Sequence, residues 1–190
     1  VQPGETVQAI DLLYGVMLPS GADCCIALAD TIAGSEEGFV ELMNQKAEKL
    51  GLENTHFCNT TGLHADDHYS TAKDIAELLR YALKNSTFRE IIESPYHSTP
   101  GTNVQPDGIT FYSTMFKNLS DATVIDGKIM GGKTGFTSEA GCCLASFAEI
   151  DDIEYILVTA GAYQAGTPHI DDAVKLYNRL GEASSVLYGR

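Results

Sequence analysis

The sequence has few basic residues and no long apolar run. Among its 190 residues, 12 are Lys or Arg and 26 are Asp or Glu, so the formal net charge is −14. Because no basic stripe offsets this acidic excess, nucleic acid is excluded as an expected partner. No stretch approaches the roughly 18 to 20 apolar residues of a membrane-spanning helix. Hydrophobic residues make up 44% of the chain, which is typical of a globular protein with a buried core.

The start of the sequence does not read as a leader peptide, and its cysteines do not read as a disulfide framework. The first five residues form no apolar run and contain neither Met nor a basic residue, so we expect the natural start to lie upstream. The cysteines, at positions 24, 25, 58, 142 and 143, include no C-x-x-C pair, and adjacent cysteines seldom bridge. We interpret them as small core residues, and they leave the cellular compartment open.

Apolar periodicity predicts that residues 1–120 are mainly helical. Helical patterns cover residues 7–17, 24–33, 35–50 and 71–83, with breaks at Pro19–Gly21, Gly34 and Gly51. The last of them opens with Thr71 and Asp74 three residues apart, as in a capping box. Residues 55–69 are predicted to form a loop.

Residues 121–190 are predicted to form a sheet and a terminal helix. Two strand-like runs, 142–148 and 153–159, flank an acidic turn at 149–152 and indicate a β-hairpin, with residues 128–130 leading a strand into it. Residues 171–180 have a helical pattern. Helices followed by an antiparallel sheet favour an α+β fold, and no linker divides the chain.

The sharpest short motif is Lys133-Thr134-Gly135. On a strand edge, a cation, a hydroxyl and a glycine let an extended ligand approach and offer partners to its carboxylate. The string Gly127 to Thr134 also matches the P-loop spacing. A P-loop requires a helix after its Lys-Ser/Thr pair, whereas a turn leading to a strand is expected here, so we reject a nucleotide site.

A second motif, Leu18-Pro19-Ser20-Gly21-Ala22-Asp23, places a hydroxyl in the break between two apolar helices. Such a serine can act at the mouth of a cleft or simply cap the second helix.

Together with their surroundings, these motifs resemble the D-alanyl-D-alanine carboxypeptidases, penicillin-binding proteins of the serine β-lactamase-like superfamily. The resemblance runs from about residue 5 to 165 and includes residues 11–15, 18–23, 39–44, 50–57, 62–63, 69–72 and 132–141. It implies a DD-peptidase-like α+β fold and a serine acyl-transfer reaction on peptidoglycan stem pentapeptides, with β-lactams trapping the same serine. No cofactor is implied. The parent protein would act outside the cytoplasm.

The family's signature motifs are S-x-x-K, S-x-N and K-T-G. By resemblance, Ser20 is the S-x-N serine that assists proton transfer, and Lys133 is the K-T-G lysine that adds positive potential. Thr134 would bind the terminal carboxylate, with Gly135 and Thr137 beside it on the strand. The backbone N–H of Phe136 would supply half of the oxyanion hole.

Two departures from the family pattern stand out. Ala22 replaces the S-x-N asparagine, which removes an amide worth about 1 to 3 kcal/mol of hydrogen bonding. The only S-x-x-K string, Ser70 to Lys73, lies between the other two motifs rather than before them. We interpret it as a helix cap with an exposed lysine, and we expect the nucleophile and its lysine to lie outside this chain.

The sequence therefore predicts that residues 1–190 are one incomplete DD-peptidase catalytic domain, without the N-terminal strands and the nucleophile helix. A chain lacking these elements would expose a sheet edge and apolar surface. We expect it to dimerise, to associate with the missing N-terminal segment, or to be marginally stable.

Two other functions remain open. The first is a non-catalytic relative that binds peptide or a partner without turnover. The second is a β-lactamase, which is weaker because no deacylating Glu motif is recognised. A metal site at His64 and His68 has helical spacing but falls in a loop and lacks H-E-x-x-H, so both are interpreted as solvated histidines.

Overall fold

Most helices precede the main sheet along the chain, as the sequence predicts. The computed structural model describes residues 1–188. Its helices are α1 (Ala9–Met17), α2 (Ala22–Ala33), α3 (Glu36–Leu50), α4 (Ala72–Ala82), α5 (Ser86–Glu93), α6 (Thr114–Asn118) and α7 (Pro168–Tyr188). Its strands are β1 (Tyr96–Ser98), β2 (Thr110–Tyr112), β3 (Thr123–Val124), β4 (Gly127–Thr137), β5 (Gly141–Ile150) and β6 (Ile153–Ala162). This is the predicted α+β class.

Local sequence signals set the helix ends. Ser35 caps α3 by accepting a hydrogen bond from the Gly38 N–H at 3.1 Å, and Gly51 ends this helix in the left-handed region with φ 71°. Thr71 caps α4 in the same way through the Asp74 N–H, also at 3.1 Å. The side-chain caps at Ser35 and Thr71 and the left-handed Gly51 define these ends, and the boundaries predicted for the two helices, 35–50 and 71–83, hold to within one residue.

The main sheet is antiparallel with the order β3-β4-β5-β6. The turn between β5 and β6 contains only Asp151 and Asp152, and both have positive φ, which suits the right-handed twist of a two-residue hairpin. The predicted turn at 149–152 is therefore too long by two residues. At the other edge, the two-residue strand β3 pairs only with Gly127 and Lys128 of β4.

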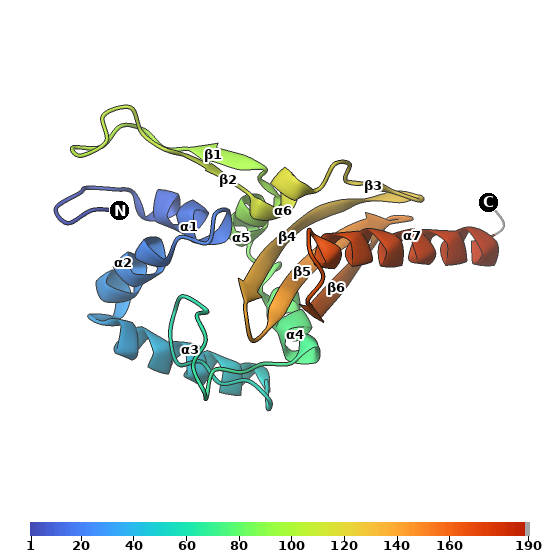
Figure 1. Cartoon of the computed structure of the whole chain (residues 1–190), viewed down its shortest axis with the longest axis horizontal. Helices are drawn as coiled ribbons and strands as arrows, with labels where there is room; N and C mark the ends of the chain where they lie inside the picture. The colour runs from blue at the N-terminus through green and yellow to red at the C-terminus, as the bar shows by residue number, and fades with distance from the viewer. Residues whose placement is uncertain (189–190) are drawn as a thin grey trace.

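Helices cover both faces of this sheet (Figure 1). On one face, Ile170, Ala173 and Tyr177 of α7 pack with Met115 of α6 against β4 and β5. On the other face, Leu79 of α4, its C-cap residue Leu83 and Ile92 of α5 pack around Phe147. The alternation of β5 residues between the two faces accounts for its nearly unbroken apolar sequence.

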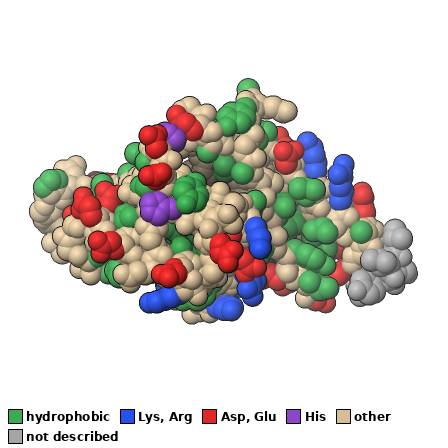
Figure 2. Space-filling model, turned by 90° about the horizontal axis from the view of Figure 1, so that it is seen from below, with side chains coloured by type: hydrophobic (Ala, Val, Ile, Leu, Met, Phe, Trp, Pro, Cys, Tyr) green, Lys and Arg blue, Asp and Glu red, His purple; other side chains and the backbone are tan. Residues whose placement is uncertain are grey.

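The helices α1–α3 curve away from the sheet (Figure 1), and α1 is attached to α5 through Tyr14, Leu18 and Ile91. Several large apolar side chains on this arc are exposed, namely Leu13, Ile26, Ile32 and Leu42. Figure 2 shows that hydrophobic side chains also gather near the C-terminal end of the face in view. Two large apolar side chains of α7, Leu176 and Leu180, are exposed as well.

The structure corrects several boundaries. The β1–β2 hairpin and helices α5 and α6 were not predicted, so residues 1–120 are less purely helical than expected. Strand β4 extends over Gly127–Thr137 rather than 128–130, and α7 begins at Pro168. The hydrophobic pattern marked only the first part of β4 and an inner part of α7, whereas the ends of these two elements depend on tertiary contacts.

Candidate active site

Ser20 lies in the short connection between α1 and α2, as the break in the apolar pattern predicts. Its φ of 65° lies in the left-handed region, which is uncommon for a residue with a side chain. The connection is held by a 2.9 Å hydrogen bond from the Gly21 N–H to the Gly15 carbonyl. A Cβ at Gly21 would lie 2.9 Å from that carbonyl oxygen. The serine is thus presented on a strained and tightly packed turn.

Lys133 brings the sheet to this turn. Its ammonium donates hydrogen bonds to the Ser20 hydroxyl and, at 2.6 Å, to the carbonyl of Thr134. Ser20 and Lys133 are 113 positions apart in the sequence. The two motifs singled out from the sequence are therefore neighbours in space.

The surroundings of Lys133 disfavour its charged form. Burial lowers the pKa of its ammonium below 10.5, and the nearby thiol of Cys25 opposes this shift only in part. No carboxylate forms an ion pair with Lys133 within the described residues. A ligand carboxylate would supply the missing counter-charge.

Thr134 contacts a residue that the sequence did not single out. Its hydroxyl oxygen lies 2.5 Å from that of Thr114, the first residue of α6. The Thr114 backbone N–H also donates to the Leu18 carbonyl at 3.1 Å. Thr114 thus links the Ser20 turn to β4. The local sequence signal near Thr114 is Ser113, which caps this five-residue helix, and that signal predicts a helix start but no contact with β4.

The remaining predicted residues follow Lys133 along β4. Phe136 is 72% exposed, and a Cβ added at Gly135 would meet nothing within 4 Å. The Thr137 hydroxyl accepts a hydrogen bond from the Ala140 N–H at 3.0 Å, which ties it to the β4–β5 turn. Beyond Lys128, the outer edge of β4 pairs with no strand in the described part of the chain.

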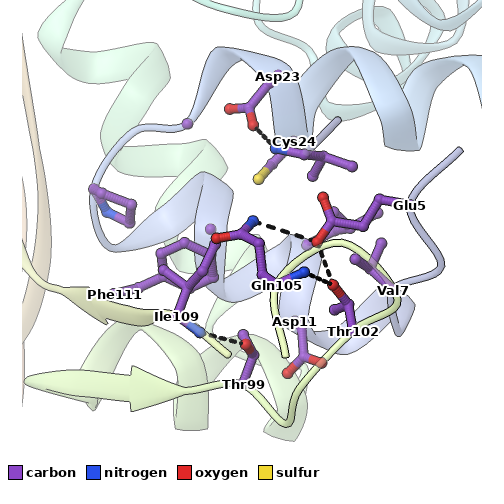
Figure 3. A pocket seen from close by; sticks show the side chains of 15 residues that line it. Glu5, Val7, Asp11, Asp23, Cys24, Thr99, Thr102, Gln105, Ile109 and Phe111 are labelled. Atoms are coloured by element: carbon purple, nitrogen blue, oxygen red, sulfur yellow. Dashed lines mark hydrogen bonds and ion pairs between the residues drawn. The ribbon is translucent and has the colours of Figure 1, made fainter. Parts of the chain in front are cut away.

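Behind the Ser20 turn lies a cavity of about 220 Å³, lined in part by Pro19, Gly21 and Phe111. Figure 3 shows that side chains of α1, α2 and the β1–β2 hairpin with its loop line this cavity. Glu5 projects into this region and accepts hydrogen bonds from the Thr102 hydroxyl and the Gln105 amide. The polar groups here fasten the N-terminal segment to the hairpin loop.

The other candidate motifs lie apart from this constellation. In the string Ser70 to Lys73, Thr71 caps α4, Ser70 lies 2.8 Å from the Thr55 hydroxyl, and Lys73 is exposed. The Asp74 carboxylate accepts from the Asn54 N–H and the Thr55 hydroxyl instead of closing the predicted capping box.

The P-loop-like string forms part of β4, with no helix after it. This agrees with the strand context expected from the sequence. Within residues 1–188, no group of three or more His, Cys, Asp or Glu side chains could hold a metal ion. None of the helices in that range is long and apolar enough to cross a membrane.

Comparison with known proteins identifies relatives. The D-alanyl-D-alanine carboxypeptidase family matches residues 1–164. The chain is 35% identical over 162 residues to D-alanyl-D-alanine carboxypeptidase DacF of Bacillus subtilis, and 37% identical over 162 residues to DacC of Escherichia coli. These alignments cover 85% of this chain but only 40% and 38% of the two relatives. The chain thus spans about two fifths of their length.

Solved structures agree with the sequence relatives. The DD-transpeptidase of Streptomyces K15 superposes with a TM-score of 0.80 at 29% identity, covering 95% of this chain and 71% of that one. The D-alanyl-D-alanine carboxypeptidase of Mycobacterium tuberculosis H37Rv also gives 0.80, at 27% identity, covering 94% and 66%. The fold, the order of the motifs and these matches together place the chain in the D-alanyl-D-alanine carboxypeptidase family.

Proposed function

We propose that this chain is the peptide-binding part of a serine-type D-Ala-D-Ala carboxypeptidase that trims peptidoglycan stem peptides outside the cytoplasm. The observation that carries the proposal is the contact of the Lys133 ammonium with the Ser20 hydroxyl, beside an edge of β4 that pairs with no strand beyond Lys128 among residues 1–188. A cation, two hydroxyls and a free edge offer the end of an extended peptide complementary partners.

In this mechanism the stem peptide adds to the outer edge of β4. Thr134 and the charge of Lys133 hold its terminal carboxylate, and the Phe136 N–H points at the carbonyl oxygen that becomes negative. The nucleophilic serine, on a segment outside this chain, attacks the carbonyl carbon of the penultimate D-Ala. The peptide bond breaks, and Ser20 relays the proton that the departing D-Ala amine takes up. Water then hydrolyses the ester and restores the serine.

The chain alone is expected to bind without turnover. Ala22 is an exposed first residue of α2 and offers no amide to the substrate, and no S-x-x-K string precedes Ser20. These two observations favour a peptide-binding role without catalysis as the second candidate. Stem peptides and β-lactams are the proposed ligands for both candidate functions.

Labelling with a fluorescent penicillin, followed by peptide mapping, tests the proposal. We expect no adduct with the 190-residue chain. A completed enzyme can be made by joining the S-x-x-K segment of the Streptomyces K15 relative to this chain in one polypeptide, and there we expect an adduct on the S-x-x-K serine. Ser20→Ala and Lys133→Ala should slow labelling of the completed enzyme. Lys128→Ala, an exposed lysine on the same strand, is the matched control.

Two outcomes would contradict the proposal. An adduct on Ser20 or Ser70 in the 190-residue chain would place the nucleophile inside it. A folded, completed enzyme that takes up no penicillin would refute the carboxypeptidase function.

A further inference from the structure

The β1–β2 hairpin has an outward face composed only of tyrosine, serine and threonine. In the register of this hairpin, Tyr96 lies opposite Tyr112, and Ser98 lies opposite Thr110. Because side chains alternate along a strand, these four residues share one face. None of them carries a charge, in a chain whose net charge is −14.

The inward face attaches the hairpin to the rest of the molecule. His97 stacks on Tyr14 with ring centroids 3.7 Å apart, and its Nε2 lies 2.6 Å from Asp11 Oδ1. Phe111 packs against the cluster of Tyr14, Leu18 and Ile91. These contacts hold the hairpin in place without help from its outward face.

The outward rings are available to a ligand. Tyr96 is 60% exposed and Tyr112 is 58% exposed, and their ring centroids are 6.2 Å apart with a 40° tilt. Next to them, the hydroxyls of Ser98 and Thr110 lie 2.8 Å from each other. A cross-strand aromatic pair stabilises a hairpin, but that role leaves more than half of the surface of each side chain in water.

Aromatic rings flanked by hydroxyls have the chemistry that recognises sugars. The C–H faces of a pyranose stack on phenol rings, while its hydroxyl and acetamido groups exchange hydrogen bonds with serine and threonine. An anionic membrane surface would need Lys or Arg, which this face lacks. A stable protein interface would need about 1,000 Å² or more, beyond what four side chains offer.

We propose that this outward face binds the glycan strand of peptidoglycan. The inference rests on the proposed function for the source of the sugar. Tyr112 is two residues from Thr114, whose hydroxyl lies beside Thr134. Tyr96 and Tyr112 are therefore at the base of the hairpin, where β1 follows α5 and β2 leads into α6 (Figure 1). A glycan on the hairpin would therefore hold its stem peptide near the strand that receives it.

Titration of the 190-residue chain with chitotetraose, a linear tetramer of N-acetylglucosamine, tests this inference. In NMR spectra, the shifted amide signals should centre on Tyr96, Ser98, Thr110 and Tyr112. Tyr96→Ala with Tyr112→Ala should weaken binding about tenfold or more, since both rings that would stack on the sugar are removed. Tyr96→Phe with Tyr112→Phe should retain most of it.

Tyr81→Ala is the matched control, because Tyr81 is an exposed tyrosine on α4. If the double alanine variant loses the hairpin, Ser98→Ala with Thr110→Val keeps both rings and should still weaken binding. Undiminished binding by the double alanine variant, shifts centred elsewhere, or no binding by the unaltered chain would each overturn the inference. Penicillin labelling tests the active site and not the hairpin. A completed enzyme that is labelled by penicillin but does not bind the sugar would therefore refute glycan binding and leave the proposed carboxypeptidase function intact.

Discussion

The charge of Lys133 depends on its surroundings. Burial lowers the pKa of its ammonium, so it loses its charge at a lower pH than an ordinary lysine. In the window between that lowered pKa and 10.5, the unfolded chain holds more protons than the folded one. The contribution of Lys133 to the free energy of unfolding therefore rises with pH through this window.

Carboxylate binding should change in the opposite direction. We expect the affinity of the chain for a peptide ending in D-Ala-D-Ala to fall as pH rises through the same window, because the binding cation disappears. Calorimetric titration at several pH values, paired with urea unfolding, separates the two effects. Lys133→Met should abolish both pH dependences, and an affinity independent of pH would show that Lys133 does not pair with the carboxylate.

Two neighbouring glycines of β4 should respond differently to alanine. A Cβ at Gly132 would lie 2.7 Å from the Met115 sulfur and 2.9 Å from the Ala145 carbonyl oxygen, so Gly132→Ala should lower the free energy of unfolding by about 1 to 3 kcal/mol. At Gly135 the added methyl meets no protein atom, so Gly135→Ala should leave stability within about 0.5 kcal/mol.

The same Gly135→Ala change should nevertheless slow penicillin labelling of the completed enzyme, since the methyl would occupy space that a ligand needs. Thermal unfolding of the Gly132→Ala and Gly135→Ala variants tests the predicted stabilities, and the rate of penicillin labelling tests the predicted effect on the ligand. Normal labelling by Gly135→Ala would remove the case for a ligand along this part of β4.

Thr114 should affect carboxylate recognition through its hydroxyl. Thr114→Val keeps the shape of the side chain but removes the group that lies 2.5 Å from the Thr134 hydroxyl. We expect peptide affinity to drop by a factor of about 2 to 10, the value of one hydrogen bond, and Thr114→Ser to restore it. Equal loss with a C-terminally amidated peptide would indicate a general structural effect instead.

Among the elements, the loop between α3 and α4 is fixed by one buried carboxylate. Asp74 of α4 is 4% exposed and accepts hydrogen bonds from the Asn54 N–H and the Thr55 hydroxyl. Asp74→Ala should lower the free energy of unfolding by about 1 to 3 kcal/mol, because both donors lose their acceptor. Urea unfolding measures this.

The loop offers its own control for that experiment. Asp67 is an exposed carboxylate in the same segment, so Asp67→Ala should change stability by less than about 0.5 kcal/mol. If the two variants were equally stable, the anchoring role of Asp74 would be wrong.

The elements that could be predicted from the sequence are those with local signals. Ser35, Gly51 and Thr71 mark helix ends through their own caps, and the runs of β5 and β6 are long enough to recognise. The strands β1 and β2 have three residues each and are separated by a long irregular loop. A strand of three residues is too short to show the alternation of apolar and polar residues by which strands are recognised in a sequence. Thr114 is brought to the site by the packing of α6 on β4, and a single sequence does not contain that information.

At the scale of the whole molecule, β6 forms one edge of the main sheet. In the described part of the chain this ten-residue strand pairs only with β5 and contains neither Lys nor Pro. Natural edge strands usually carry such protecting residues. The exposed side chains of Ile153, Leu176 and Leu180 add apolar surface nearby.

We therefore expect the 190-residue chain to self-associate or to be marginally stable, and to become monomeric when the S-x-x-K segment is supplied. Size-exclusion chromatography with light scattering measures the mass. Val158→Lys, which places a charge on the edge strand, should reduce self-association. A compact, stable monomer of the unaltered chain would contradict this expectation.

The contact between Ser20 and Lys133 also has a kinetic consequence. The strands β4, β5 and β6 are joined by short turns and can pair early, whereas the serine turn must find the sheet across 113 positions of chain. Closing a loop of that length costs entropy that only later packing offsets. During refolding, sheet formation should come before ligand affinity, and a chain arrested on the way would have its strands but no site.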